Sequence, residues 1–368
     1  MLLSGRGGPL VAQPFFTIGV PTYNRHDLLR ETLNSILAQD FIDFEVIVGN
    51  DYTDEELSGE MIGISDPRIR YVNHPQNLRE VGNMNALLDM ASGRYFTWLF
   101  DDDLHEPGYL ATAYQFLTDN DFPPALFSSF RQLRGENGFS PREVTLSKHR
   151  LLTGREFLRE YFAGHVKIVS TSGLFDTSEL KNVVGGVEEL CGSTIGVYCE
   201  YLFLVRCALL GRIAYLDAPF VVMRLHSDSW SQSNLQLNKF REAGQPLVKR
   251  CADVFRNQYL AADLYSNLLG ISKLHLYSFA YKSAKHEIAL NKFGIGAAYR
   301  AITRLAEENA VTKRTVTEET GGEGLFTTLG FLRMLIRHSC LVFAWLLVFW
   351  MRRFRPSFMQ LTRSYTPK

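Results

Sequence analysis

The sequence predicts an α/β fold with a mostly parallel central sheet, followed by a helical region. Short apolar runs alternate with segments of helical period over residues 15–100, and helical periodicity continues alone beyond residue 235. Polar side chains directly follow several of the apolar runs. Strands that alternate with helices of about 10–15 residues form parallel sheets with right-handed crossovers.

The first predicted strand covers 15–21 and ends at Pro21. From residue 27 the leucines and an isoleucine recur with a period near 3.6, which predicts a helix. Further elements are expected in chain order: strands at 44–49 and 69–72, a helix over 81–92 that ends at Gly93, and a strand at 95–100.

The strand at 95–100 leads directly into Asp101, Asp102 and Asp103. Two unit charges about 4 Å apart repel by roughly 4 kcal/mol at an effective dielectric constant near 20. Three carboxylates can therefore separate into water, raise their pKa values, or share a divalent cation. Carboxylate oxygens suit Mg²⁺ or Mn²⁺. The alternative is a solvated acidic turn before a helix that begins near Pro107.

Three polar loops follow predicted strands, at Asn24, at Asp51 and at the acidic triplet. In parallel sheets ligands bind outside the carboxyl ends of the strands, so these loops are expected to meet at one edge. The sequence has no glycine-rich phosphate loop, so a cation and side chains would have to hold any nucleotide phosphates.

Three long motifs occur in order over residues 17–103. They are T-I-G-V-P-T-Y-N-R, L-x-x-T-L-x-S-I-L-A-Q-D-F-x-D-F-E-V-I-V-x-N-D, and N-x-x-x-x-G-N-M-N-A-L-L-D-M-A-S-G-R-Y-F-T-W-L-F-D-D-D. Together they resemble the amino-terminal half of a family 2 glycosyltransferase, and the likeness covers roughly residues 15–230. The resemblance implies a GT-A fold with a Rossmann-like sheet, a nucleotide-sugar donor, and Mn²⁺ or Mg²⁺ as cofactor.

The resemblance also implies site residues. Asp51 stands where the family reads the nucleobase, while Asn50 replaces the usual preceding aspartate. The acidic triplet matches the DxD motif, in two registers that the sequence leaves open. The implied donor-binding residues are Pro21, Tyr23, Asn24, Arg25, Asp51, Asn85, Asp101, Asp102 and Arg224. The implied metal ligands are Asp101, Asp102, Asp103 and His226.

Residues 199–211 have a helical period, with Gly211 as a stop signal. They resemble the family's acidic-pair helix, which implies that Glu200 is the general base of the reaction. Cys199 stands where the family has the first acid of the pair. The alternative is that Glu200 is a surface acid paired with an arginine.

The composition limits the partners and the cellular compartment of the protein. Lys+Arg and Asp+Glu each number 39, so charge does not point to a nucleic-acid partner. Five cysteines without a CxxC or metal-ligand spacing indicate a reducing compartment and neither a disulfide framework nor a zinc site. No basic start precedes an apolar segment near residue 1, so a cytoplasmic protein is expected.

We predict four segments: a GT-A domain over 12–234, a helical extension over 235–311, a linker over 312–324 and an apolar, basic tail over 325–368. The longest uncharged part of the tail, residues 339–351, has 13 residues. This is shorter than the ~20 needed to span a bilayer. We therefore expect residues 325–355 to bind the inner face of the membrane peripherally; the alternative is a homodimer interface.

The predicted function is that of an inverting, metal-dependent glycosyltransferase. It would move a sugar from a UDP-linked donor to a glycan or lipid-linked acceptor in cell-surface polysaccharide synthesis. The alternative is a non-catalytic GT-A scaffold that holds partner transferases at the membrane. The departures at Asn50 and Cys199 are the sequence features that support this alternative.

Overall fold

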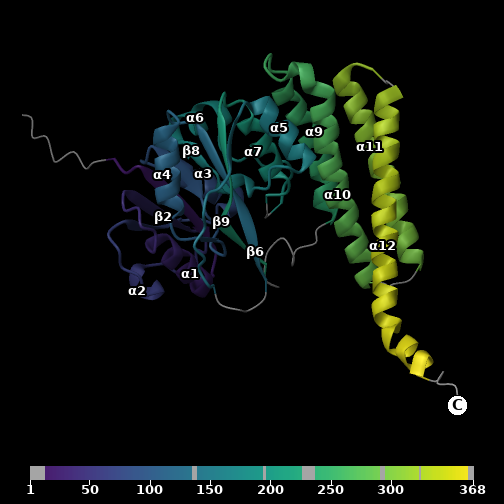
Figure 1. Cartoon of the computed structure of the whole chain (residues 1–368), viewed down its shortest axis with the longest axis horizontal. Helices are drawn as coiled ribbons and strands as arrows, with labels where there is room; N and C mark the ends of the chain where they lie inside the picture. The colour runs from purple at the N-terminus through teal and green to yellow at the C-terminus, as the bar shows by residue number, and fades with distance from the viewer. Residues whose placement is uncertain are drawn as a thin grey trace, which may run out of the picture. The chain divides into compact units, whose positions relative to one another are not determined.

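A computed structural model describes residues 13–134, 139–193, 196–225, 237–290, 295–322 and 325–363. The chain divides into two compact units (Figure 1). One comprises Met1–Glu189 with Ser193–Ser229, and the other comprises Leu190–Gly192 with Trp230–Lys368. The first unit is the α/β domain, and the second is a group of long helices.

The first four strands of the α/β unit form the parallel part of the sheet, in the spatial order β3-β2-β1-β4. Their bounds are β1 (Phe16–Thr22), β2 (Phe44–Asn50), β3 (Ile69–Asn73) and β4 (Tyr95–Trp98). All four were predicted from apolar runs, and the carboxyl ends of these strands lie at one edge of the sheet. This edge carries the three polar loops.

The sheet continues from β4 through β8, β6 and β9 to β5, and β7 pairs with β9. The bounds are β5 (Leu104–His105), β6 (Ala125–Arg134), β7 (His149–Leu152), β8 (Leu174–Asp176) and β9 (Ile213–Leu225). Of these pairings only β6 with β9 is parallel. This second half of the sheet is therefore mixed, and β9 runs along β6 to bring its carboxyl end back toward the acidic triplet.

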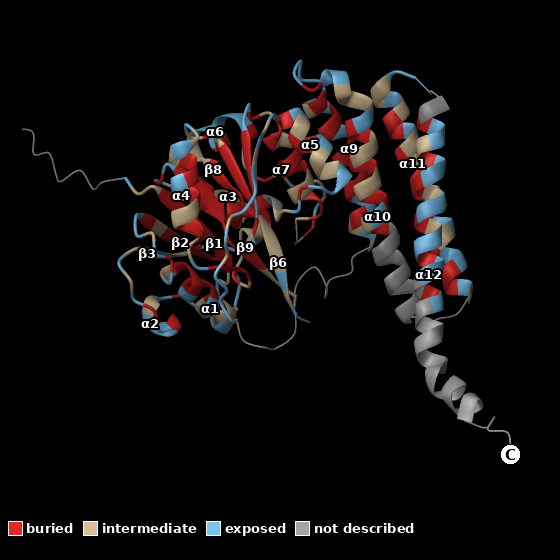
Figure 2. Cartoon of the chain, viewed as in Figure 1, coloured by how far each residue is buried: buried red, intermediate tan, exposed pale blue. Residues whose placement is uncertain are grey.

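Helices cover both faces of the sheet and create two cores (Figure 2). The helices α1 (His26–Leu37) and α4 (Tyr109–Asp119) contribute to one core, and α3 (Arg79–Met90), α5 (Gly154–Ala163) and α7 (Cys199–Cys207) to the other. Trp98 is fully buried in the second core, where its indole N–H donates to the Met84 carbonyl at 2.8 Å. Short helical turns complete the unit at Gly59–Ile62, Ser170–Ser172, Thr177–Glu179 and Leu180–Val184.

Gly93 does not end a helix as predicted, because α3 stops at Met90 with Ala91 as its C-cap. A Cβ atom at position 93 would lie 2.6 Å from the Thr17 nitrogen and 2.7 Å from the Phe16 carbonyl carbon. The Gly93 N–H donates to the Thr17 hydroxyl at 2.8 Å. The glycine is therefore required by its close approach to the backbone of β1.

The second unit contains α9 (Leu237–Phe255), α10 (Leu264–Leu290), α11 (Ile295–Thr320) and α12 (Leu325–Arg363), with a 3-10 turn at Ala261–Asp263. The linker expected over 312–324 is instead helical as far as Thr320. The hydroxyls of Thr312 and Thr315 donate to the carbonyls of Glu308 and Val311, at 2.8 and 3.2 Å, and Val316 is fully buried. The threonine hydroxyls thus form hydrogen bonds within the helix. The polar composition of residues 312–320 therefore does not mark a linker.

Candidate functional site

The acidic triplet lies just beyond the carboxyl end of β4, as predicted. Asp101 and Asp103 are each only 5% exposed. The Thr32 hydroxyl of α1 lies 2.9 Å from the Asp101 carbonyl oxygen and 2.8 Å from that of Asp103. Asp101 and Asp103 are therefore buried in a fixed turn, and the alternative of a solvated acidic turn is wrong.

Arg25 joins two of the three carboxylates. Its Nη1 lies 3.2 Å from an oxygen of Asp101 and 3.2 Å from an oxygen of Asp102. The second oxygen of Asp101 accepts a hydrogen bond from the Thr22 hydroxyl at 2.7 Å. Asn24 has a left-handed backbone with φ of 52° and turns the chain between β1 and α1. This turn directs Arg25 across the triplet.

Arg224, near the carboxyl end of β9, forms hydrogen bonds with the acidic triplet. Its backbone N–H donates to the Asp103 carboxylate at 3.0 Å, and its Nε donates to the Asp102 carbonyl at 3.1 Å. The guanidinium also pairs with Glu31 at 2.8 Å. Arg224 thus lies beside the acidic turn.

Burial and mutual repulsion shape the charges of this turn. Burial raises the pKa of Asp101 to about 6, with a further contribution from the charge of Asp102, while Arg25 and Thr22 act in the opposite direction. Burial also raises the pKa of Asp103 well above its ordinary value, as do the charges of Asp102 and Glu200. The turn therefore favours a positive group in its neighbourhood.

Glu200 is in the first turn of α7. Tyr198, the residue before α7, has a left-handed backbone with φ of 62°, which turns the chain into the helix. Burial raises the pKa of Glu200 to about 7, and the negative charge of Glu80 contributes. Because Glu200 also acts on the pKa of Asp103, it belongs to the same charge cluster as the triplet.

Glu80 is a member of this cluster that the sequence analysis missed. Its carboxylate accepts a hydrogen bond from the Gly196 N–H at 2.9 Å, and burial is the main cause of its raised pKa. The charge of Asp102 raises that pKa further, whereas Arg25 lowers it. Glu80 opens the helix that follows β3, so the rule that placed Asp51 at the sheet edge could also have found Glu80.

Asp51 follows β2 and anchors the start of α3. Its carboxylate accepts a hydrogen bond from the Leu78 N–H at 2.6 Å, and burial raises its pKa. Behind it, His74 hydrogen-bonds to Asn83 at 3.0 Å, and the Asn83 amide donates to the Gly49 carbonyl at 2.8 Å. His74 and Asn83, which the sequence analysis did not select, therefore hold the end of β2, from which the Asp51 loop begins.

Comparison with known proteins identifies the family of the chain. The family model for glycosyl transferase family 2 matches residues 17–176. A GalNAc(5)-diNAcBac-PP-undecaprenol beta-1,3-glucosyltransferase of Campylobacter jejuni is 31% identical over 282 residues, which cover 73% of this chain and 89% of the relative. Glycosyltransferase GlyA of Streptococcus pneumoniae is 32% identical over 124 residues, which cover 32% of this chain and 18% of the relative. The chain belongs to glycosyltransferase family 2.

A solved structure supports the fold. S. aureus TarS 1-349 in complex with UDP-GlcNAc matches with a TM-score of 0.59 and 16% identity, over 88% of this chain and 90% of that chain. The predicted GT-A type of α/β fold is therefore confirmed, and this glycosyltransferase is an enzyme of the transferase class.

The family's usual aspartate is replaced by Asn50, and the structure gives this asparagine a role that a carboxylate could not fill. The Asn50 Nδ2 donates to the carbonyls of Tyr52 and Glu55 at 3.2 and 2.8 Å. It also donates to the Asn73 side-chain oxygen at 2.8 Å. An ionised aspartate has no hydrogen to donate. Asn50 therefore shapes the loop that carries Asp51.

Cys199 replaces the first acid of the family's pair. It is 1% exposed, and its sulfur lies 2.9 Å from the Gly196 carbonyl oxygen, where the thiol donates. Its pKa is raised well above the usual range by burial, with contributions from the charges of Glu200 and Glu80. A neutral thiol adds no further negative charge to this cluster of acids, and both departures from the family pattern have a structural explanation.

The other predicted donor-binding residues are placed differently. Tyr23 is 42% exposed, and its ring packs edge-on against Tyr52, with 5.3 Å between the ring centroids. Pro21 is buried within β1. Both heavy atoms of the Asn85 amide bond to the backbone of Val187, each at 2.8 Å. His226 lies outside the described residues.

Within the described ranges, no three His, Cys, Asp or Glu side chains are grouped so that they could hold a metal ion. The chemistry of the acidic turn nevertheless suits a hard divalent cation, because carboxylate oxygens are its preferred ligands. Burial and, after it, repulsion by Asp102 raise the pKa of Asp103, and a cation beside these two residues would oppose that repulsion. The residues therefore fit the family's metal chemistry.

We predict that Asn50→Asp lowers the free energy of unfolding by about 2 kcal/mol, because it removes the amide N–H groups that contact Tyr52, Glu55 and Asn73 and places a second carboxylate beside Asp51. Urea unfolding measures the change. Asn77→Asp is the matched control, since the Asn77 side-chain oxygen accepts a hydrogen bond from the Arg79 N–H at 2.9 Å, which an aspartate can also accept. It should change stability by less than about 0.5 kcal/mol. An Asn50→Asp protein as stable as the control would disprove the structural role of Asn50.

Proposed function

We propose that this family 2 glycosyltransferase moves a sugar, with inversion, from a nucleoside diphosphate sugar to a lipid-linked glycan. The proposal rests on one observation. Asp51, the acidic triplet, Glu80 and Glu200 come from loops and helix starts at one edge of the sheet, and the triplet, Glu80 and Glu200 influence one another electrostatically. A strand-end site of this kind suits a charged donor and a proton acceptor.

In the proposed site, Asp51 reads the nucleobase and the triplet holds the ribose and the cation. Asp101 already uses both carboxylate oxygens on Thr22 and Arg25, so we assign the cation to Asp102 and Asp103. When bound, a divalent cation would act as a Lewis acid toward the diphosphate leaving group.

Glu200 is the proposed general base. Its carboxylate would accept the proton of the acceptor hydroxyl while that oxygen bonds to the anomeric carbon, and the bond to the diphosphate breaks on the opposite face. A pKa near the working pH suits this task, because the group must be ionised before the reaction and protonated after it. Glu80 supports the role by adding to the raised pKa of Glu200.

For the donor we propose a UDP-sugar and test it by calorimetric titration with UDP, with and without Mn²⁺. Binding should require Mn²⁺ and weaken at least about tenfold in Asp102→Ala, since one cation-ligand contact is worth more than about 1.4 kcal/mol. Asp102 is chosen because its side chain is 17% exposed, against 6% for Asp101. If GDP or dTDP binds instead of UDP, only the proposed nucleotide of the donor is wrong, and the proposed transfer reaction stands. A folded protein that binds no nucleotide would favour the non-catalytic scaffold.

We predict that Glu200→Gln abolishes transfer and leaves the affinity for the nucleotide within about twofold, because the amide cannot accept the proton. In the unaltered enzyme, turnover should rise with pH through about 7, the raised pKa of Glu200, and then level off. Glu80→Gln should move this midpoint to lower pH, since a nearby negative charge raises the pKa of a carboxyl group. Retained turnover in Glu200→Gln would exclude Glu200 as the base.

The acceptor is proposed from the relative in Campylobacter jejuni, whose name gives an undecaprenol-diphosphate-linked oligosaccharide as substrate. An acceptor of this kind is anchored in a lipid layer, so we also propose that the enzyme acts at the inner face of the membrane.

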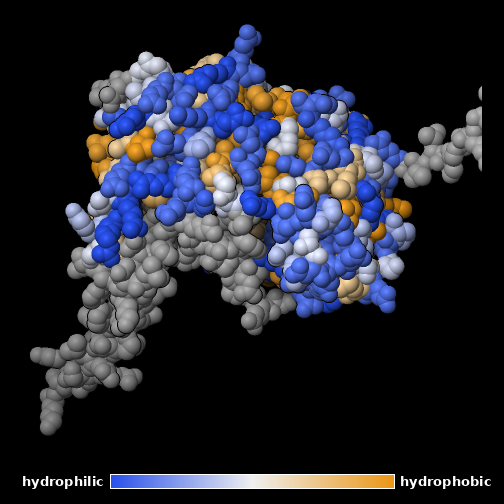
Figure 3. Space-filling model, turned by 180° about the vertical axis from the view of Figure 1, so that it is seen from behind, coloured by the Kyte–Doolittle hydropathy of each residue, from blue (hydrophilic) through white to orange (hydrophobic). Residues whose placement is uncertain are grey.

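The proposed membrane contact is α12. No described helix is long and apolar enough to cross a membrane. Large apolar side chains are nevertheless exposed along α12 at helical spacing, with Leu332, Ile336 and Phe343 at 50%, 55% and 54%. On the face drawn in Figure 3, hydrophobic residues form separate patches among hydrophilic ones. Arg333 and Arg337 are interspersed on the same helix, a pattern that suits an anionic lipid surface.

We predict that the double substitution Ile336→Ser and Phe343→Ser weakens sedimentation with vesicles of phosphatidylglycerol and phosphatidylcholine by more than about tenfold. The control is Ile42→Ser, an isoleucine that is 75% exposed on the α/β unit. A variant that binds vesicles normally but loses a dimer in sedimentation velocity would show that α12 is instead a subunit interface.

A further inference from the structure

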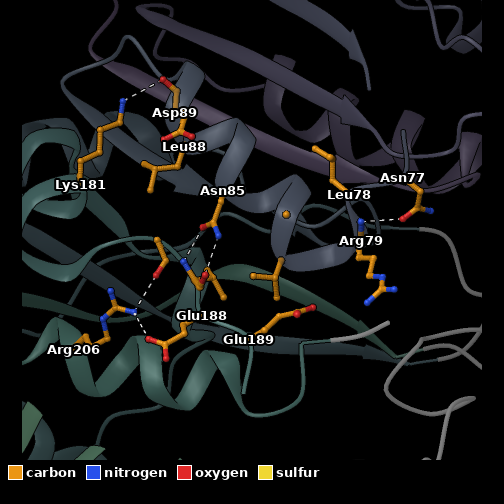
Figure 4. A pocket seen from close by; sticks show the side chains of 14 residues that line it. Asn77, Leu78, Arg79, Asn85, Leu88, Asp89, Lys181, Glu188, Glu189 and Arg206 are labelled. Atoms are coloured by element: carbon orange, nitrogen blue, oxygen red, sulfur yellow. Dashed lines mark hydrogen bonds and ion pairs between the residues drawn. The ribbon is translucent and has the colours of Figure 1, made fainter. Parts of the chain in front are cut away.

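A hollow in the α/β unit, which we call the α3 groove, runs along α3 (Figure 4). Leu78, Gly82, Asn85 and Asp89 line one side at a spacing that places them on one face of the helix. Residues 186–189 line the other side, with Lys181 and Arg206. Its volume is about 900 Å³, which lies at the upper end of the range of small-molecule pockets.

The walls of the α3 groove are held together by specific bonds. The Asn85 amide spans the two sides through its paired hydrogen bonds with Val187. The Arg206 guanidinium donates to the Gly186 carbonyl at 3.1 Å. Gly185 has φ of 76°, a conformation that favours glycine, and a Cβ atom at Gly186 would collide with the Asn85 side chain. The groove is therefore preformed, which lowers the entropic cost of binding a ligand.

The lining of the groove limits the chemistry of its ligand. Its charged side chains are equally divided between the two signs: Arg79, Lys181 and Arg206, and Asp89, Glu188 and Glu189. A polyanion would meet as many carboxylates as cations, so the groove does not suit nucleic acid or a phosphate polymer. Amide and charged groups are spread along its length, which does not suit an alkyl chain. A neutral, polyhydroxylated chain can use donors and acceptors of both kinds.

The position of the groove connects it with the candidate active site. At one end, Leu78 donates its N–H to Asp51, and the adjacent Arg79 has a left-handed backbone with φ of 61°. Glu80 follows directly and bonds to Gly196, a few residues before Glu200 in the chain. The helix that carries one wall therefore also carries a member of the acid cluster. A chain molecule in the groove could place one end near Glu200.

We propose that the α3 groove binds the oligosaccharide part of the acceptor. The sugar units in the groove would be those that lie beyond the unit to which the new sugar is transferred. This inference rests on the proposed function. Arg79 lies at the end near the donor loop, and Asp89 and Lys181 lie at the far end, where the Lys181 ammonium donates to the Asp89 carbonyl at 3.3 Å. The groove makes the enzyme select acceptors by length.

The test uses the full chain and synthetic polyprenyl-diphosphate-linked acceptors that carry one to six N-acetylhexosamine units. Transfer and acceptor-independent hydrolysis of the donor are both measured. In the unaltered enzyme, kcat/KM should rise at least about tenfold as the acceptor lengthens. Lys181→Glu and Asp89→Arg, both at exposed positions, should reduce kcat/KM for the longest acceptor toward that for the shortest. Neither should change donor hydrolysis, because both lie at the end remote from Asp51.

Lys148→Glu is the matched control, an exposed lysine of the same unit that does not line the groove. It should retain the full dependence on acceptor length. The proposal is overturned if the unaltered enzyme transfers equally well to all lengths, or if both groove variants keep the dependence of the control. If the enzyme still hydrolyses the donor in that case, the proposed function stands and only the role of the groove is wrong. Absence of both hydrolysis and transfer with every nucleotide sugar would defeat the function and the groove together.

Discussion

The pairing of Arg25 with Asp101 and Asp102 is the interaction on which the arrangement of the site depends. Buried carboxylates next to one another are tolerated only when charge and hydrogen bonds compensate them. Here Arg25 supplies the charge, and Thr22 donates to Asp101. All these partners come from β1 or from the loop that follows it. Because β1 pairs with β4 in parallel, the two loops emerge side by side.

The same constraint explains why burial and raised pKa values coincide at this edge. Asp103, Glu80 and Glu200 each have a raised pKa with burial as the leading cause, and each is also influenced by another acid of the cluster. Such an arrangement costs stability, which is typical of functional sites. The left-handed backbones of Asn24, Arg79 and Tyr198 occur in the loops and at the helix starts next to this cluster.

The helix α3 has three roles in the α/β unit. Its apolar face, with Met84 and Leu87, fills the core against the sheet, and its first turn delivers Glu80 to the acid cluster. A third set of its residues lines the α3 groove. One helix therefore connects the stability of the fold, the candidate chemistry and the proposed selection of acceptors.

Local patterns in the sequence predicted the first four strands, the acidic triplet and the helix that carries Glu200. These features depend on apolar runs, on hydrophobic period and on motifs within short segments. Predictions failed where a residue type has two structural uses. Gly93 was expected to cap a helix but allows close approach to β1, and the threonines after residue 311 continue a helix.

The sequence by itself determined the order of strands and helices, the acids after β2 and β4, and the family to which they belong, because these are encoded in contiguous residues. Only the tertiary structure decided which acids meet. Glu80 and Glu200 are far apart in the chain, and the hydrogen bond from Gly196 to Glu80 joins their segments. The α3 groove likewise depends on Asn85 holding Val187. Contacts between distant segments follow from packing, which no local pattern specifies.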